Sequence, residues 1–339
     1  MATVNEFEID DVCVKAGECR TIELPITKLY THSDVSIPIH IINGKKPGPK
    51  LFVSAAIHGD EINGVEIIRR LLKHKSLQRL VGTLIAIPIV NVHGFIHQSR
   101  YLPDRRDLNR SFPGSERGSL AARLAYLFMN KIVAKCTHGI DLHTGAIHRT
   151  NLPQIRANLN DEDTAALATA FGAPVLIDAN LRDGSLREAA ANLGVPMLLY
   201  EAGEALRFDE IAIRAGERGV LNVMRALGML SSKRTKKPAL KAPYIARTSS
   251  WVRASSSGVI TSSVSLGNLV EAKSVLGIVS DPFGENEVEV VAPFQGIVIG
   301  KTNLPLVNEG DALIHIARFG NEEMVAEHVE EFHAYYEPS

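Results

Sequence analysis

The stretch KLFVSAAIHGDE, residues 50–61, indicates both the fold and the place of a site. Its first eight residues, Lys50–Ile57, form an apolar run that is typical of a buried strand. Apolar residues then recur at helical spacing through Ile62–Lys73, which predicts an amphipathic helix directly after the strand. A buried strand followed by such a helix is the repeating unit of sheets that helices cover on both faces.

The same alternation of apolar runs and amphipathic stretches continues to residue 229. It predicts an α/β fold with a mixed, mostly parallel sheet flanked by helices. In front of it, the alternating segments Arg20–Ile26 and Val35–Ile42 indicate edge strands, and Gly44–Pro49 indicates a turn. The further expected strands are Thr83–Val90, Gly139–Leu142, Val175–Ile177 and Pro196–Tyr200, and the further expected helices are Leu120–Lys135, Thr164–Phe171, Ser185–Leu193 and Asp209–Met229.

The last third of the chain has a different composition and residue pattern. Residues 231–243, SSKRTKKPALKAP, are basic and poor in large apolar side chains, which indicates a solvated linker. Short strands rich in Val, Ile and Gly follow, in two similar halves at 258–279 and 296–316. This pattern resembles the biotinyl/lipoyl fold, an all-β barrel or sandwich. The hairpin between the halves, residues 281–287, has no Lys to carry a prosthetic group, so we expect a structural cap rather than a carrier.

Composition narrows the classes of function. The 339 residues carry 37 Lys and Arg against 38 Asp and Glu, so the net charge of −1 predicts neither a nucleic-acid nor a membrane partner. The three cysteines form no C-x-x-C pair, which favours a reducing compartment. Residues 1–11 lack the basic and apolar regions of a signal peptide, and no apolar run has the length of a membrane span. We therefore expect a cytoplasmic protein.

The residues His58 and Glu61 have the chemistry of metal ligands. The H-x-x-E spacing puts an imidazole and a carboxylate within one turn at a strand exit, where both can reach one Zn²⁺. His143, at the end of another short strand, would complete a His₂Glu site and leave a position for water, while Asp141 is suited to hold its ring. A second copy of the spacing, His328–Glu331, has no third ligand after it, and we expect it on a solvated helix face.

Two further polar segments also follow expected strands. The Arg-rich loop Arg100–Gly114 comes after Thr83–Val90, and Arg is suited to bidentate recognition of a carboxylate. Glu201 ends the strand Pro196–Tyr200, where a carboxylate beside a zinc would serve as general base. Open α/β sheets build their sites at the carboxyl ends of parallel strands, and all four segments lie there.

In chain order, H-G-D-E, R-Y…D-L-N-R-x-F-P-G, D-L-H-T-G and the Glu of Y-E-A-G resemble the motifs of the succinylglutamate desuccinylase/aspartoacylase family, a branch of the zinc carboxypeptidase-like hydrolases. The resemblance covers residues 50–229 and reaches into the β-rich end. The stretch from Arg100 to Asp107 is slightly longer than in aspartoacylase, so Arg105 and Arg106 stay alternatives to Arg100. The resemblance implies one Zn²⁺ per chain on His58, Glu61 and His143, Glu201 as general base and then acid, Asn109 and Arg110 on the substrate carboxylate, and Arg100 on the scissile carbonyl.

We expect a zinc-dependent deacylase that cleaves the amide bond of a small N-acyl amino acid or related carboxylate by metal-activated water. A zinc carboxypeptidase or esterase on a small substrate is the first alternative, and a non-catalytic binding protein with the zinc fold is the second. The sequence is compatible with a monomer and with a homo-oligomer. The expected division of the chain is an N-terminal β segment at 1–45, a catalytic domain at 46–230, a linker at 231–243, a β-domain capping the active site at 244–319, and a tail at 320–339.

Overall fold

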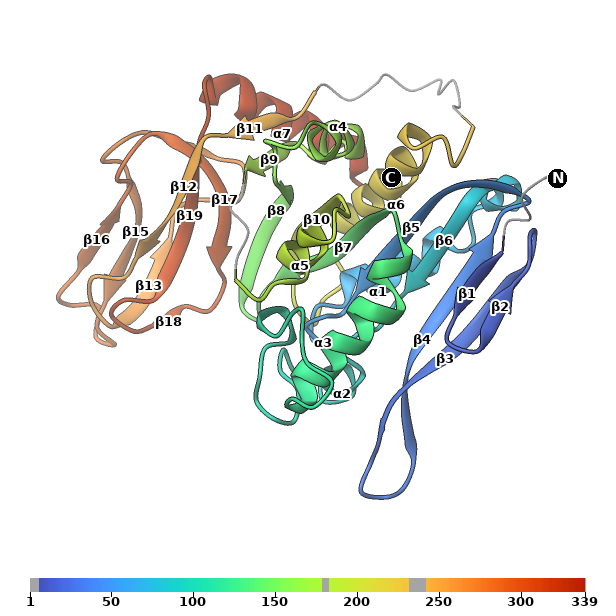
Figure 1. The fold of residues 1–339 in the computed structure, drawn as a ribbon. Coiled ribbons are helices and arrows are strands. Elements are labelled where there is room, and N and C mark those ends of the chain that lie inside the picture. The colour runs from blue at the N-terminus through green and yellow to red at the C-terminus, as the bar shows by residue number, and fades with distance from the viewer. Residues whose placement is uncertain (1–5, 179–182, 232–241, 339) are drawn as a thin grey trace.

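The computed structural model describes residues 6–178, 183–231 and 242–338. One large mixed sheet runs through these residues, helices cover both of its faces, and a smaller antiparallel sheet lies at one end (Figure 1). The predicted linker, residues 231–243, falls almost wholly outside the described ranges. Within them, no helix is both long enough and apolar enough to cross a membrane.

The large sheet contains thirteen strands within the described residues, and its main path runs β12-β19-β17-β8-β10-β7-β5-β6-β4-β3. The neighbours β10, β7, β5 and β6 are parallel, as the alternation of strands and helices predicts. The strands are β3 Cys19–Lys28, β4 Asp34–Asn43, β5 Lys46–Ala55, β6 Val81–Ile87, β7 His138–Gly145, β8 Arg149–Ala157, β9 Val175–Asp178, β10 Met197–Glu204, β11 Tyr244–Ala246, β12 Thr248–Arg253, β14 Leu269–Val270, β17 Gly296–Thr302 and β19 Ala312–Arg318.

Helices bury both faces of the central strands, which explains the continuous apolar run of β5. Leu51 and Val53 pack in one core with residues of α1, α4 and α6, whereas Phe52 packs on the other side with residues of α3 and α5. The alternation of a strand sends successive side chains to opposite faces, so every residue from Leu51 to Ala55 is buried. The helices are α1 Asn63–Leu71, α2 Val92–Ile96, α3 Leu120–Lys131, α4 Glu162–Phe171, α5 Leu186–Asn192, α6 Glu210–Ala226 and α7 Glu322–Tyr336.

The C-terminal strands form a further core and also extend the large sheet. Strand β17 pairs with β8, so the sheet continues from the α/β part into the C-terminal part. A separate sheet of order β16-β15-β13-β18 packs over β17 and β19 around Leu276, Val298 and Leu313. Its strands are β13 Gly258–Ser262, β15 Val275–Ser280, β16 Val288–Val291 and β18 Leu306–Val307, and an N-terminal hairpin consists of β1 Phe7–Ile9 and β2 Val12–Val14.

Two local features differ from expectation or were not expected. Gly44–Pro49 is mostly strand, since β5 already begins at Lys46. Here Gly48 and Pro49 lie so close to Gly82 that a Cβ on Gly82 would be 2.1 Å from the Pro49 carbonyl oxygen. The glycines thus permit a close approach of backbones rather than a turn. Strand β8 has no predicted counterpart, and Pro153 lies at the bulge in its pairing with β10.

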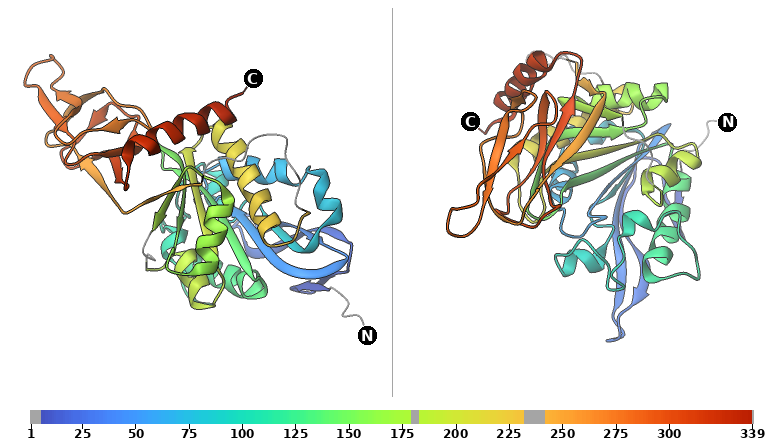
Figure 2. Two further views of the ribbon diagram at one scale, coloured as in Figure 1. Left: turned by 90° about the horizontal axis from the view of Figure 1, so that it is seen from above. Right: turned by 90° about the vertical axis from the view of Figure 1, so that its left-hand side faces the viewer.

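The second H-x-x-E copy lies on a helix, α7, but the expectation of a solvated face is wrong for His328. Its side chain is 2% exposed, and its ring centroid lies 5.5 Å from that of Tyr244. Figure 2 shows α7 lying across the C-terminal strands and against α6. Burial in this packing gives His328 a structural role.

Candidate metal centre and substrate cavity

His58 and Glu61 lie on the short connection between β5 and α1. Ala56 takes a left-handed conformation, φ 52°, as the chain leaves the strand. The carbonyl oxygens of Ala55 and Ala56 accept hydrogen bonds from the amides that follow β6, both at 3.0 Å, which ties the two strand ends together. A Cβ on Gly59 would lie 1.9 Å from the backbone of Gly94, so only glycine lets the connection pass this close.

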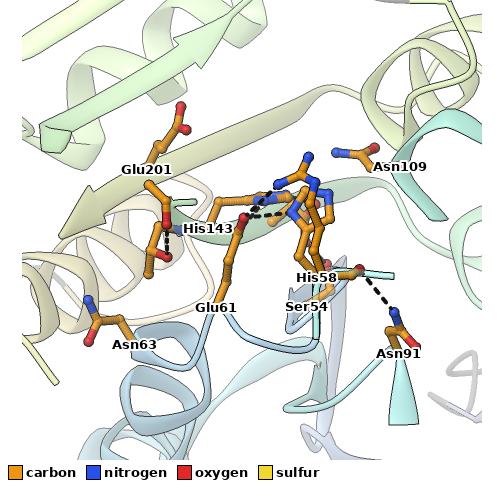
Figure 3. Close-up of polar contacts among 12 residues, drawn as sticks. Ser54, His58, Glu61, Asn63, Asn91, Asn109, His143 and Glu201 are labelled. Atoms are coloured by element: carbon orange, nitrogen blue, oxygen red, sulfur yellow. Dashed lines mark hydrogen bonds and ion pairs between the residues drawn. The ribbon is translucent and has the colours of Figure 1, made fainter. Parts of the chain in front are cut away.

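The two imidazoles and one carboxylate converge on one point. Nδ1 of His58 lies 2.7 Å from Oε1 of Glu61, and Nδ1 of His143, on the neighbouring strand β7, lies 2.8 Å from Oε2 (Figure 3). One ligand atom from each residue lies within 4.8 Å of the others, and all three side chains are buried. Two nitrogens and a carboxylate are the donors that a catalytic zinc site uses.

Each imidazole also contacts a carboxylate through its second nitrogen. Nε2 of His143 lies 2.6 Å from Asp141, whose other oxygen accepts a hydrogen bond from the Ser54 hydroxyl at 2.7 Å. Nε2 of His58 lies 3.1 Å from Asp107. Such contacts orient imidazole ligands and raise their basicity. The sequence pointed to Asp141, but gave no separate signal for Asp107 within the D-L-N-R motif.

Charges of both signs meet in the cluster. Burial alone would raise the pKa of Glu61, but the two imidazoles outweigh burial and hold the pKa well below its usual range. Burial would likewise lower the pKa of His143, yet Asp141 and Glu61 raise it well above its ordinary value. Three carboxylates, two of which also bond to Arg100, surround the two imidazoles and can balance the charge of a bound cation. The donor set and its surroundings therefore fit a divalent metal.

The Arg-rich loop contributes three of the predicted residues to the same place. Arg100 bonds to Asp107 at 2.9 Å and to Glu61 at 3.3 Å. Asn109 is buried, its side-chain oxygen accepts a hydrogen bond from the Leu186 amide at 2.9 Å, and its amide nitrogen points toward the cluster in Figure 3. Arg110 lines the same cavity.

The alternatives Arg105 and Arg106 lie elsewhere. Both are exposed, and Arg106 reaches Asp104 at 4.0 Å. Neither side chain lines the cavity that contains Arg100.

Glu201 lies at the carboxyl half of β10, beside β7. It pairs in parallel register with His143 and in antiparallel register with Gln154 of β8. Its carboxylate accepts a hydrogen bond from Nε of Arg156 at 2.5 Å. Because β8 had no predicted counterpart, the sequence gave no indication of Arg156.

These side chains surround one cavity of about 660 Å³ at the carboxyl ends of the parallel strands. Its volume lies in the range of sites for small molecules. Ser249 and Trp251 of β12 also line it, so the C-terminal part reaches the site. Its charged lining consists of Glu61, Arg100, Arg110, Arg149, Arg156, Asp178, Arg187 and Glu201.

Known proteins share this arrangement of elements. Residues 47–227 match the family model described as the succinylglutamate desuccinylase/aspartoacylase catalytic domain. A curated relative, the N-alpha-acetyl-L-2,4-diaminobutyric acid deacetylase of Halomonas elongata, is 27% identical over 332 residues, which cover 93% of this chain and 94% of the relative. A succinylglutamate desuccinylase/aspartoacylase structure from Rhodobacter sphaeroides has a TM-score of 0.79 at 24% identity, covering 90% of this chain and 95% of that chain. The product-bound ectoine utilization protein EutE (DoeB) of Ruegeria pomeroyi has a TM-score of 0.81 at 23% identity, covering 94% and 99%.

Proposed function

The chain belongs to the succinylglutamate desuccinylase/aspartoacylase family, and from this premise we propose that it is a zinc-dependent deacylase acting on a small N-acyl amino acid or related carboxylate. One observation carries the proposal. A His–Glu–His cluster and a further carboxylate, Glu201, line the same small-molecule cavity. The activity for which the Halomonas relative is named, deacetylation of an acetylated amino acid, supports the same reaction class.

In this proposal, His58, Glu61 and His143 hold the zinc ion. When bound, zinc lowers the pKa of a water molecule toward ~7 and polarises a carbonyl group. Asp107 and Asp141 keep the two imidazoles in the orientation that ligation requires, with Nδ1 facing Glu61.

Glu201 is proposed as the general base. Its carboxylate takes a proton from the attacking water and then passes that proton to the leaving amine. Arg156 donates to one carboxylate oxygen at 2.5 Å, which fixes the carboxylate and leaves the second oxygen to act. Arg100 would donate to the oxygen of the scissile carbonyl as negative charge develops there.

Asn109 and Arg110 are proposed to bind the carboxylate of the substrate. The oxygen of Asn109 is already engaged by the Leu186 amide, so its NH₂ group can donate. Arg110 contacts its neighbour's backbone oxygen at 2.5 Å and keeps further N–H groups for a ligand. Both contacts exist before and after the acyl bond breaks, so they contribute binding more than rate.

A zinc carboxypeptidase or esterase would use the same residues and is the alternative for the reaction. A non-catalytic zinc-fold binder is the second alternative, but it has no need of a carboxylate at the position of Glu201. The cavity volume favours a small substrate over a long peptide. The proposal also places the enzyme in the cytoplasm, as a monomer or as a homo-oligomer.

The direct test is turnover by the zinc-loaded enzyme on a matched panel. The panel contains N-acetyl and N-succinyl amino acids, the corresponding esters, and peptides with a free carboxyl end. Cleavage of at least one N-acyl amino acid with higher kcat/KM than its ester and peptide counterparts is expected. Faster cleavage of peptides would favour the carboxypeptidase, and no turnover by a zinc-loaded, folded enzyme would favour the binder.

A further inference from the structure

We propose that Asn151 of β8 is a specificity-determining residue, whose carboxamide donates a hydrogen bond to an oxygen of the substrate away from the bond that is cleaved. Gly300 of β17 leaves the room that this carboxamide occupies at the cavity wall. The inference rests on the proposed function and extends it by a substrate contact outside the metal centre.

The side chain of Asn151 is enclosed, yet the protein offers it no partner. The residue lines the cavity and is 6% exposed. Within residues 6–178, 183–231 and 242–338, no hydrogen bond of its carboxamide is found. Enclosed amides without a partner are rare because they destabilise the fold. A ligand in the cavity can supply the missing partner of Asn151.

Strand pairing on both sides of β8 fixes the backbone of Asn151. The residue pairs with Gly203 of β10 and with Gly300 of β17. The next residue, Leu152, is fully buried in a core that includes Ile297. Because successive side chains of a strand point to opposite faces, this packing agrees with the place of Asn151 in the cavity wall.

Gly300 allows the carboxamide to lie where it does. A Cβ on Gly300 would be 2.7 Å from Oδ1 of Asn151, 3.3 Å from Cβ of His315 and 3.5 Å from Cη2 of Trp251. Only the first separation is too short for two such atoms to keep, so an alanine would displace the end of the Asn151 side chain. With Oδ1 beside Gly300, the NH₂ group is left to donate, and its partner is an acceptor oxygen of the ligand.

The register of the strands separates this contact from the reacting bond. Glu201 pairs with His143 of β7, whereas Asn151 pairs with Gly203, two residues further along β10. Strand β8 is also one strand further from β7 than β10 is. A contact with a part of the substrate that does not react is present in the ground state and in the transition state, so it changes KM more than kcat.

Substitutions of Asn151 test the contact in the zinc-loaded enzyme with its best N-acyl amino acid. Asn151→Leu removes both polar atoms at similar volume, and Asn151→Asp keeps the shape but removes the donor. We expect KM to rise about 2–10-fold in Asn151→Leu, as for one lost hydrogen bond, and further in Asn151→Asp, while kcat changes less than about twofold. Asn192→Asp, at the exposed end of α5, should leave both constants unchanged.

Gly300→Ala tests the same contact without altering Asn151. We expect KM to rise as in Asn151→Leu, because the new Cβ displaces the carboxamide. In an Asn151→Ala background, the same Gly300→Ala change should leave KM as it is, because no carboxamide is left to displace. Gly320→Ala, at an exposed position, is the control.

Melting temperature and zinc content show that each variant is folded and loaded. An unchanged KM in both Asn151→Leu and Asn151→Asp would overturn the assignment. So would a fall in kcat without a rise in KM, or an equal effect of Gly300→Ala with and without the Asn151 carboxamide.

The contacted oxygen can belong to the amino acid or to the acyl group, and the two products separate these sources. Inhibition constants of the released amino acid and of the released acid are compared between the wild type and Asn151→Leu. The product that loses affinity carries the contacted oxygen, and unchanged affinity for both products would contradict the contact.

If the folded, zinc-loaded enzyme cleaves no N-acyl amino acid, the proposed function fails, and binding still tests Asn151. Calorimetric titration with N-acetyl and N-succinyl amino acids then compares the wild type with Asn151→Leu and Gly300→Ala. Weaker binding in both variants supports the contact. Equal binding in all three proteins, or no binding to the wild type, contradicts it.

Discussion

At the residue scale, each imidazole of the candidate metal centre meets a carboxylate through its second nitrogen. Asp107→Asn and Asp141→Asn keep the shape of each side chain but remove the charge that His58 and His143 face. We expect each change to lower zinc affinity about 10–100-fold. Competition with a chelator measures the affinity. Asp34→Asn, at the exposed start of β4, is the matched control. Zinc binding as tight as in the wild type in both site variants would contradict this role.

Glu201→Gln tests the proposed base, because it keeps the shape of the side chain and removes its ability to take a proton. We expect kcat to fall about 10²–10⁴-fold while KM and zinc content change little. Steady-state kinetics on the best N-acyl amino acid, with metal analysis of each protein, measures this. A near-wild-type kcat would mean that another group is the base, and the buried Asp60, between two proposed ligands, would be examined first.

Arg110→Ala should act differently from Glu201→Gln. The proposed contact of Arg110 with the substrate carboxylate is present in the ground state and in the transition state, so its loss weakens binding in both. We expect a strong rise in KM, with a fall in kcat only where the substrate loses alignment. The same kinetic series measures it, and an unchanged KM would remove Arg110 from the substrate site.

The sequence could indicate His58, Glu61 and His143 because each follows or ends an apolar run that can be predicted as a strand. Parallel strands bring such ends together, and the three side chains do meet. Asp107 and Arg156 were not predictable in the same way. Their partners, His58 on the β5–α1 connection and Glu201 on β10, are far away in the sequence, and the fold rather than local spacing brings them close.

At the element scale, α1 and α6 are joined by a network of charged side chains. Glu66 accepts hydrogen bonds from Arg69 and Arg70, and Arg70 also pairs with Glu210 through two hydrogen bonds of 2.8 Å. The Arg69 and Arg70 side chains lower the pKa of Glu66 to about 2. The pKa of Glu210 is also lowered to about 2, by Arg70 and Arg214.

Because both pKa values are lower in the folded state, this contribution to stability is present above the ordinary carboxylate pKa and is lost as the pH falls toward 2. Arg70→Met should therefore lower the melting temperature at pH 7 by about 2–4 °C, which corresponds to about 1 kcal/mol. At pH 3 the difference from the wild type should shrink. Calorimetry at both values measures it, with Arg79→Met as control, and an equal loss at both would contradict the network.

The predictability of the elements follows their burial. Strands such as β5 and β6 are covered on both faces, so their sequences are continuous apolar runs. Strand β8 joins the α/β part to β17 and lines the cavity with polar residues. Its buried apolar residues, such as Leu152 and Ile155, are separated by Pro153 and Gln154, so neither alternation nor an apolar run marks it as a strand.

At the scale of the whole molecule, α7 connects the C-terminal strands with the α/β part. Phe332 is fully buried and packs against Ala215 of α6 and Tyr336. Phe332→Ala should destabilise the protein by about 3–5 kcal/mol, because it removes a large buried side chain and leaves a cavity. Met324→Ala on the same helix, where the side chain is 48% exposed, should have little effect. Chemical unfolding measures both, and equal effects would contradict the packing role of α7.

The architecture was predictable at this scale because alternation of strands and helices implies a parallel sheet with its site at one edge. The continuation of the sheet from β8 into β17 was not predictable, since it depends on pairing between segments far apart in the chain. That pairing brings Trp251 to the cavity. We therefore expect the C-terminal strands to take part in substrate selection as well as in stability.

Zinc titration of the metal-free enzyme, followed by hydrolysis of its best N-acyl amino acid, tests the proposed centre most directly. We expect activity to rise with added zinc to a break at one zinc per chain, because the proposed ligands His58, Glu61 and His143 form one cluster. Glu331→Gln should behave as the wild type, and His143→Ala should show no rise. Full activity without zinc, or an equal rise in His143→Ala, would contradict the proposed centre.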